Sequence, residues 1–163
     1  MSGAKDSSRE LLRHTLATVA YRGGKALRGA PESFAGFSMG VESRSPAQIL
    51  AHVGDLFDWA LSIAKGQQAW TASAPRAWNE EVARFFAAVK KFDEYLASGE
   101  ALQASTDSLF QGPIADALTH IGQIAMLRRL AGAPIKGENY FKAEIVGGRV
   151  GPQQAAPRRE FDY

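Results

Sequence analysis

Histidine is scarce in this 163-residue chain, and the three histidines are His14, His52 and His120. Neutral imidazole is a common metal ligand, and it titrates near neutral pH. His120 follows Asp116 by four residues and precedes Gln123 by three. On a helix these three side chains share one strip of roughly 60° of arc, so the carboxylate and the imidazole reach the same point. This spacing suits two ligands of one metal ion.

His52 lies on a different segment, within an apolar stripe formed by Ile49, Leu56, Trp59 and Ile63. A buried imidazole must find partners, because leaving its nitrogens unsatisfied costs of order 1–3 kcal/mol. If the two segments face each other, His52 joins Asp116 and His120. Two histidines and one carboxylate leave open positions for water or substrate, as in catalytic metal sites. A buried polar network in a non-catalytic core is the alternative interpretation.

Three other residues are further candidates for this site. Gln123 and Asp55 are close enough in sequence to orient the ligands by hydrogen bonds or to assist the chemistry. His14 lies off the apolar stripe of its own segment, so we expect it to be partly exposed and outside the site. No separate general base stands out.

Four segments carry the apolar periodicity of helices, whereas strand patterns are nearly missing. At 1.5 Å per residue each helix is about 30 Å long. The expected helices cover residues 7–28, 46–65, 76–97 and 113–132. They predict an all-α four-helix bundle over residues 7–132. Residues 133–163 are expected to be an irregular C-terminal extension that packs on the bundle or is partly disordered.

Specific residues mark the ends of these helices. Ser7 or Ser8 is the expected N-cap of the first helix, and Gly23 weakens its last turns. Ser45, followed by a proline, is the expected N-cap of the second helix. Pro113 is the expected start of the fourth helix.

Composition excludes several classes of protein. Hydrophobic residues make up 45% and charged residues 22% of the chain, which is typical of a globular domain rather than a disordered one. With 19 Lys and Arg against 17 Asp and Glu, the net charge of +2 does not indicate nucleic-acid binding. The chain has no cysteine, which excludes disulfides, cysteine-ligated zinc and iron–sulfur clusters.

The apolar segments are too short for a membrane protein. No apolar run approaches the roughly 20 residues that span a bilayer. Residues 1–10 lack the basic start and apolar core of a signal peptide. We therefore expect a cytoplasmic protein without a membrane partner.

Two short stretches resemble a known family. Residues 49–52 (ILAH), followed by residues 116–124 (DALTHIGQI), are similar to motifs of the DinB-like (DNA-damage-inducible) four-helix proteins. The resemblance extends over roughly residues 9–132. Its most specific part is the His-x-Gly-Gln element of the second stretch, with Arg128 and Gly132 downstream.

The resemblance implies an up-down-down-up bundle, often a homodimer, with one divalent metal ion, zinc or nickel. Members bind it through three histidines, one from the second helix and two, four residues apart, from the fourth. His52 and His120 match two of these positions. The third is Asp116, which departs from the common pattern, favours manganese or iron slightly more, and makes metal-bound water less acidic.

The resemblance also indicates an activity, because some members are similar to thiol-dependent S-transferases that use bacillithiol, mycothiol or glutathione. We therefore expect a divalent-metal-dependent enzyme, an S-transferase or a hydrolase, acting on a small molecule. The alternative is a non-catalytic bundle that binds a small ligand or a protein partner. Trp70 and Trp78 are expected to be exposed and to suit a homodimer interface. Asn139, Tyr140 and Phe141 are expected to cover one end of the bundle.

Overall fold

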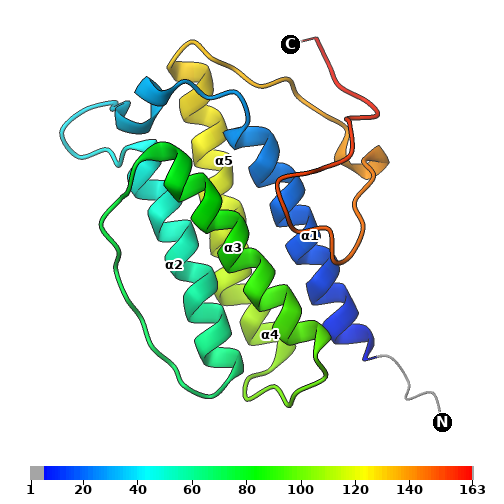
Figure 1. The fold of residues 1–163 in the computed structure, drawn as a ribbon. Coiled ribbons are helices and arrows are strands. Elements are labelled where there is room, and N and C mark those ends of the chain that lie inside the picture. Colours follow the sequence, from blue (N-terminus) through cyan, green and yellow to red (C-terminus); the bar gives the residue numbers. More distant parts are fainter. Residues whose placement is uncertain (1–5, 163) are drawn as a thin grey trace.

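The structure is a computed structural model that describes residues 6–162. Residues 1–5, half of the segment inspected for a signal peptide, and residue 163, the last of the expected extension, lie outside the described part. The chain folds into four long helices (Figure 1). They are α1 Ser7–Leu27, α2 Pro46–Ala64, α3 Trp78–Ala97 and a last helical run composed of α4 Thr106–Leu109, η2 Phe110–Ile114 and α5 Ala115–Leu130. The fold is all-α, as predicted.

Shorter elements complete the described chain. Two 3-10 helices are present, η1 Glu32–Gly36 before α2 and η3 Tyr140–Lys142 near the C-terminus. Within residues 6–162 there is no strand, and Glu138 and Glu160 form an isolated antiparallel bridge. None of the described helices has the length and apolarity needed to cross a bilayer.

The helices differ in direction. In Figure 1, α1 and α5 run one way, whereas α2 and α3 run the other way. Because α2 and α3 are parallel, the connection of residues 65–77 runs back along the bundle. Both α1 and α2 pack against α3 and α5. This arrangement makes α2 and α5 direct neighbours, which is what brings residues of these two helices together.

The core fills the space among the four helices, and α2 is its most buried member. The largest fully buried side chains include Leu16, Leu50, Phe57, Phe85, Phe92, Leu109, Ile114 and Ile124. The buried face of α2 runs through Leu50, Val53 and Phe57. Val53 follows His52 by one residue, about 100° around the helix. His52 therefore lies at the edge of the buried face and is only partly buried, although the sequence pattern predicts that it is buried within the apolar stripe.

Of the two predicted N-cap residues, the one for α2 is confirmed and the one for α1 is wrong. The Ser45 hydroxyl accepts from the Gln48 N–H, while the Gln48 side chain accepts from the Ser45 N–H, so the predicted N-cap of α2 is a full capping box. The N-cap of α1 is Asp6 rather than Ser7 or Ser8. Its carboxylate accepts from the N–H groups of Ser8 and Arg9, and a charged acceptor also interacts well with the helix dipole.

Gly23 does not weaken the end of α1, which remains α-helical to Leu27. It packs against α3, since a Cβ at this position would lie 2.6 Å from Phe85 Cζ. The missing side chain therefore allows α1 and α3 to approach closely.

The last helical run starts earlier than predicted. It begins at Thr106, with Ser105 as its N-cap, so Pro113 lies inside the run rather than at its start. Proline lacks an N–H and clashes with the carbonyl four residues earlier in a regular α-helix. The π-helical turn η2 contains Pro113 and widens the helix there, one turn before Asp116.

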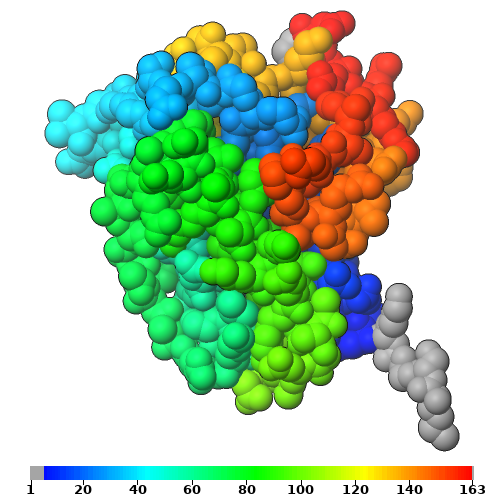
Figure 2. All heavy atoms as spheres, viewed as in Figure 1, coloured from blue at the N-terminus to red at the C-terminus, as the bar shows by residue number. Residues whose placement is uncertain are grey.

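The C-terminal segment lies along α1. In Figure 2 this segment, orange to red, covers part of the blue α1 surface. Glu138 is buried there and accepts from the Tyr21 hydroxyl at 2.6 Å and from Lys25 Nζ at 2.7 Å. Tyr140 packs edge-to-face on Tyr21, whereas Phe141 is exposed. The C-terminal segment thus packs on the side of α1, whereas residues 139–141 were expected to cover one end of the bundle.

Trp78 differs from the expectation of an exposed interface residue. Its side chain is buried and packs edge-to-face on Phe34 of η1, with ring centroids 5.5 Å apart. Trp70, in the connection between α2 and α3, is exposed as expected.

Candidate metal centre

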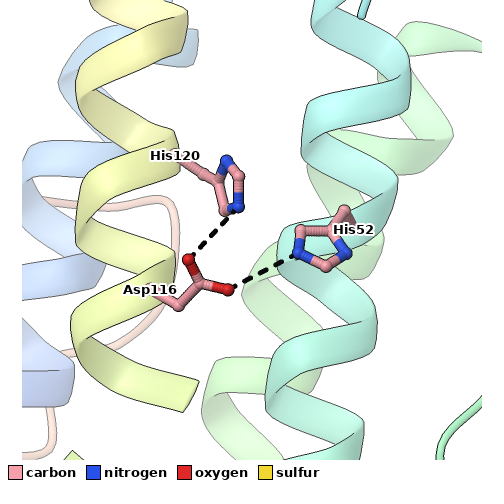
Figure 3. A group of neighbouring side chains, drawn as sticks. All are labelled: His52, Asp116 and His120. Carbon is pink, nitrogen blue, oxygen red and sulfur yellow. Dashed lines mark ion pairs between the residues drawn. The ribbon is translucent and has the colours of Figure 1, made fainter. Parts of the chain in front are cut away.

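Three side chains from two helices meet between α2 and α5 (Figure 3). His52 comes from α2, and Asp116 and His120 come from successive turns of α5. Asp116 Oδ2 lies 3.6 Å from His52 Nε2, and Asp116 Oδ1 lies 3.4 Å from His120 Nε2. One ligand atom from each residue lies within 4.8 Å of the other two. This group of three could hold a metal ion.

The spacing of these atoms fits a metal centre. Ligand atoms bound at about 2.1 Å in a tetrahedral zinc site lie about 3.4 Å apart. The distance from each histidine Nε2 to its nearer Asp116 oxygen, Oδ2 for His52 and Oδ1 for His120, is close to this value. Two imidazoles and one carboxylate complete three positions of such a site and leave a fourth position open. The side chain of Asp116 is 47% exposed, so the group can be reached from solvent.

Gln123 orients His120. Its Oε1 lies 2.7 Å from His120 Nδ1. Because an amide oxygen only accepts hydrogen bonds, Nδ1 of His120 donates to it, so in the neutral form of the ring, the form that binds metals, Nε2 keeps its lone pair. That lone pair faces Asp116 and the shared point. Hydrogen bonds of this kind hold metal-binding histidines in one tautomer and one orientation.

The surroundings of His52 favour its neutral form. Burial lowers the pKa of His52, repulsion from His120 in its protonated form and from Arg44 lowers it further, and Asp116 offsets only part of the effect. The ring packs edge-to-face on His120, with centroids 4.7 Å apart, and on Trp70 at 5.6 Å. Its pKa therefore favours the neutral form at neutral pH, which is the form that binds metals.

An open cleft of about 660 Å³ adjoins the two histidines. His52, His120 and Gln123 lie on its wall, and the other lining residues are Met39, Arg44, Ile49, Met126, Leu127 and Leu130. Most of these other residues are apolar, as is typical of sites for small molecules. The two histidines of the group thus line a cleft large enough for an organic ligand.

The other two sequence candidates lie outside the group. His14 is exposed on α1, as predicted. Asp55 has partners of its own, because its carboxylate accepts from the N–H and hydroxyl of Ser73 and from Arg84. These bonds attach the connection of residues 65–77 to α2. They give Asp55 a structural role in place of the predicted orienting one.

Sequence reasoning missed most of the cleft. Arg44 and Met39 come from the loop before α2, where no periodicity places side chains in space. Leu127 was detectable, since it follows His120 by seven residues. At 100° per residue it lies within about 20° of His120 on α5, whereas Leu130 and Met126 lie about 80° and 120° around the helix from His120.

The chain matches no family model, and comparisons with curated proteins and with solved structures find no match either. The resemblance to the DinB-like proteins therefore rests on the residues quoted above.

Proposed function

We propose that His52, Asp116 and His120 bind one divalent metal ion and that the protein is a metal-dependent enzyme acting on a small molecule in the adjoining cleft. The observation that carries the proposal is the convergence of the three ligand atoms together with the hydrogen bond that sets the His120 tautomer. In the neutral ring this hydrogen bond directs the Nε2 lone pair of His120 toward the shared point, as a metal-binding histidine requires.

The chemistry would be that of a Lewis acid, since a divalent ion at this position lowers the pKa of a water molecule or of a thiol and makes it a better nucleophile. The protein side chains supply position and environment. Gln123 holds the proton of His120 at Nδ1. Ile49 and Leu127 give the cleft a partly apolar wall, which strengthens electrostatic interactions within it. An S-transferase or a hydrolase is the class of reaction that this arrangement favours.

The proposal includes the DinB-like family. The directions of the helices, with α2 parallel to α3, support an up-down-down-up bundle of that type. So does the pairing of one ligand on the second long helix with two on the last. Zinc and nickel remain the expected ions. The carboxylate of Asp116 adds manganese and iron to the candidates, because harder ions prefer oxygen ligands.

Partners and location follow the sequence-based predictions. We propose a small-molecule substrate with a low-molecular-weight thiol as cosubstrate, a homodimer, no nucleic-acid partner and a cytoplasmic location. Half-exposed Trp70 is available for a dimer contact. Sedimentation velocity at several protein concentrations measures the oligomeric state directly.

Elemental analysis of the purified, untagged protein tests the metal centre. We expect about one divalent ion per chain in the wild type and in His14→Ala, and a large loss in His52→Ala. His14→Ala is the matched control, because it removes an exposed histidine outside the site. Loaded protein is then assayed for transfer of a thiol to electrophiles and for hydrolysis.

A different result assigns the protein to the alternative class. If neither purified protein nor protein reconstituted with zinc, nickel, manganese and iron holds metal, the three side chains form a polar network only. The chain would then be a non-catalytic bundle that binds a ligand or a protein partner.

A further inference from the structure

The cleft continues well beyond the candidate metal centre. On α5 its wall passes from His120 through Met126 to Leu130, ten residues or about 15 Å further along the helix. Ile49 of α2 and Met39 of the preceding loop contribute further apolar surface. A molecule much larger than water or a simple thiol fits along this wall.

The far part of the wall exposes apolar side chains to solvent. Met39 is 54%, Met126 63% and Leu130 46% exposed, although all three line a concave surface. Apolar surface gathered in a concavity is characteristic of a binding site rather than of an ordinary solvated face. Methionine side chains also adapt easily to ligands of different shape. These features indicate an apolar portion in the ligand.

Arg44 is the charged residue of this wall. It is exposed and lines both this cleft and a smaller one that contains His52 and Asp55. Within the described part of the chain, Arg44 makes no ion pair and no hydrogen bond through its side chain. By contrast, Arg84 binds carboxylates and Arg128 binds backbone carbonyls. The guanidinium of Arg44 is therefore free for an anionic group, for which its planar fork is well suited.

We propose that the cleft binds a free small molecule that combines an apolar chain or ring with an anionic group. Arg44 pairs the anionic group beside His52, and Met126 and Leu130 cover the apolar part. That such a molecule is the substrate rests on the proposed function, whereas its binding does not require the metal. The proposal thereby specifies a class of substrate, the amphiphilic anions.

Calorimetric titration of the metal-free, full-length protein with sodium 1-octanesulfonate, below its micellar concentration, tests the proposal. The sulfonate carries the required charge but is a poor metal ligand. Neutral 1-octanol and short-chain methanesulfonate are the matched probes. We expect 1-octanesulfonate to bind more tightly than either, because it alone satisfies both Arg44 and the apolar wall.

Variants separate the two contributions. Arg44→Gln should weaken binding of 1-octanesulfonate at least about fivefold and leave 1-octanol unchanged. Arg129→Gln is the control, since Arg129 is exposed on α5 but does not line the cleft. Leu130→Ser should weaken both octyl probes. Added salt should weaken 1-octanesulfonate binding to the wild type more than to Arg44→Gln.

Three results would overturn the proposal. The first is equal affinity of Arg44→Gln and Arg129→Gln for 1-octanesulfonate. The second is no binding of either octyl probe to the wild type. The third is a dimer that must dissociate before 1-octanesulfonate binds, which would assign the cleft to a second copy of the chain. None of these outcomes changes the metal content, so failure here is distinguishable from failure of the metal centre.

Discussion

At the scale of single residues, the candidate centre depends on the position of one proton. Gln123 Oε1 accepts from His120 Nδ1, so in the neutral ring Nε2 keeps the lone pair that a metal ion needs. Without that acceptor the ring can rotate or take the other tautomer, and the ligand atom is no longer held near Asp116. Gln123 is exposed, so its replacement removes this hydrogen bond with little effect on packing.

Gln123→Ala is therefore expected to lower the metal affinity by about 10- to 100-fold while leaving the thermal midpoint of the metal-free protein unchanged. Competition with a chromophoric chelator measures the affinity. Gln123→Glu, which retains an acceptor oxygen, should recover much of it. Gln111→Ala is a matched control at an exposed glutamine outside the cleft. Equal affinity in Gln123→Ala and Gln111→Ala would contradict the orienting role.

At the scale of elements, close contacts determine where the helices can lie. Gly23 of α1 faces Phe85 of α3, with only 2.6 Å between an added Cβ and the ring. Gly122 of α5 is also helical, but an added Cβ there meets nothing within 4 Å. Two helical glycines with the same intrinsic propensity thus have opposite packing environments.

Gly23→Ala should lower the free energy of unfolding by about 1–3 kcal/mol, because the new methyl group overpacks the contact between α1 and α3. Gly122→Ala should instead raise it by up to about 1 kcal/mol, since alanine is the better helix former and the space is open. Urea unfolding of both variants measures the difference. A Gly23→Ala protein as stable as Gly122→Ala would show that the two helices separate without cost.

The connection of residues 65–77 is attached to α2 by Asp55. Burial raises the pKa of Asp55, but hydrogen bonds from Ser73 and from the Arg84 guanidinium outweigh it and hold the pKa below its usual value. A carboxyl group with a lowered folded-state pKa contributes stability above the unfolded-state pKa of about 3.9. That contribution disappears as the pH falls through the folded-state pKa.

Asp55→Asn is expected to cost about 2–3 kcal/mol at pH 7, because the partly buried Arg84 loses the more buried of its carboxylate partners. The difference from the wild type should shrink as the pH decreases below about 4. Asp58→Asn is the control, because Asp58 is exposed and its carboxylate lies 3.1 Å from the same guanidinium. We expect this substitution to cost less than about 1 kcal/mol. A pH-independent difference would contradict this account.

At the scale of the whole molecule, two kinds of contact join parts that are distant in sequence. The C-terminal segment is joined to α1 through Glu138, whose side chain is fully buried against Lys25 and Tyr21. The candidate centre joins α2 to α5. The two contacts involve different helices, so each can be removed separately.

Glu138→Ala should destabilise the fold by about 3 kcal/mol, because it leaves Lys25 buried with Glu160 as its remaining carboxylate. Phe141→Ala, in the same segment but 96% exposed, should have almost no effect. Thermal unfolding compares them. A stable Glu138→Ala protein would show that the segment is held by other contacts.

Metal binding should stabilise the whole fold. A metal ion held by both α2 and α5 binds the folded state in preference to the unfolded state, adding about 2.7 kcal/mol when free metal is 100 times the dissociation constant. Thermal unfolding with and without chelator measures the effect. His52→Ala should show none of it, whereas His14→Ala should match the wild type.

Local features of the structure were predictable from sequence. The fold class and the four long helices follow from apolar periodicity, and the capping box at Ser45 follows from residue types. The strip of Asp116, His120 and Gln123 was predictable for the same reason, because helix geometry alone places residues three and four apart together. The start of the last helical run was missed, since a π-helical turn accommodates Pro113 against its usual preference.

Packing decided what local geometry does not determine. His52 and Asp116 are 64 residues apart in the sequence, and their proximity depends on which helices are neighbours and on the rotation of α2. Tertiary structure also pairs Asp55 with Arg84, buries the side chain of Trp78 and places Arg44 at the cleft. The sequence determined the residues able to bind a metal ion. The packing of the helices determined that three of them face one point.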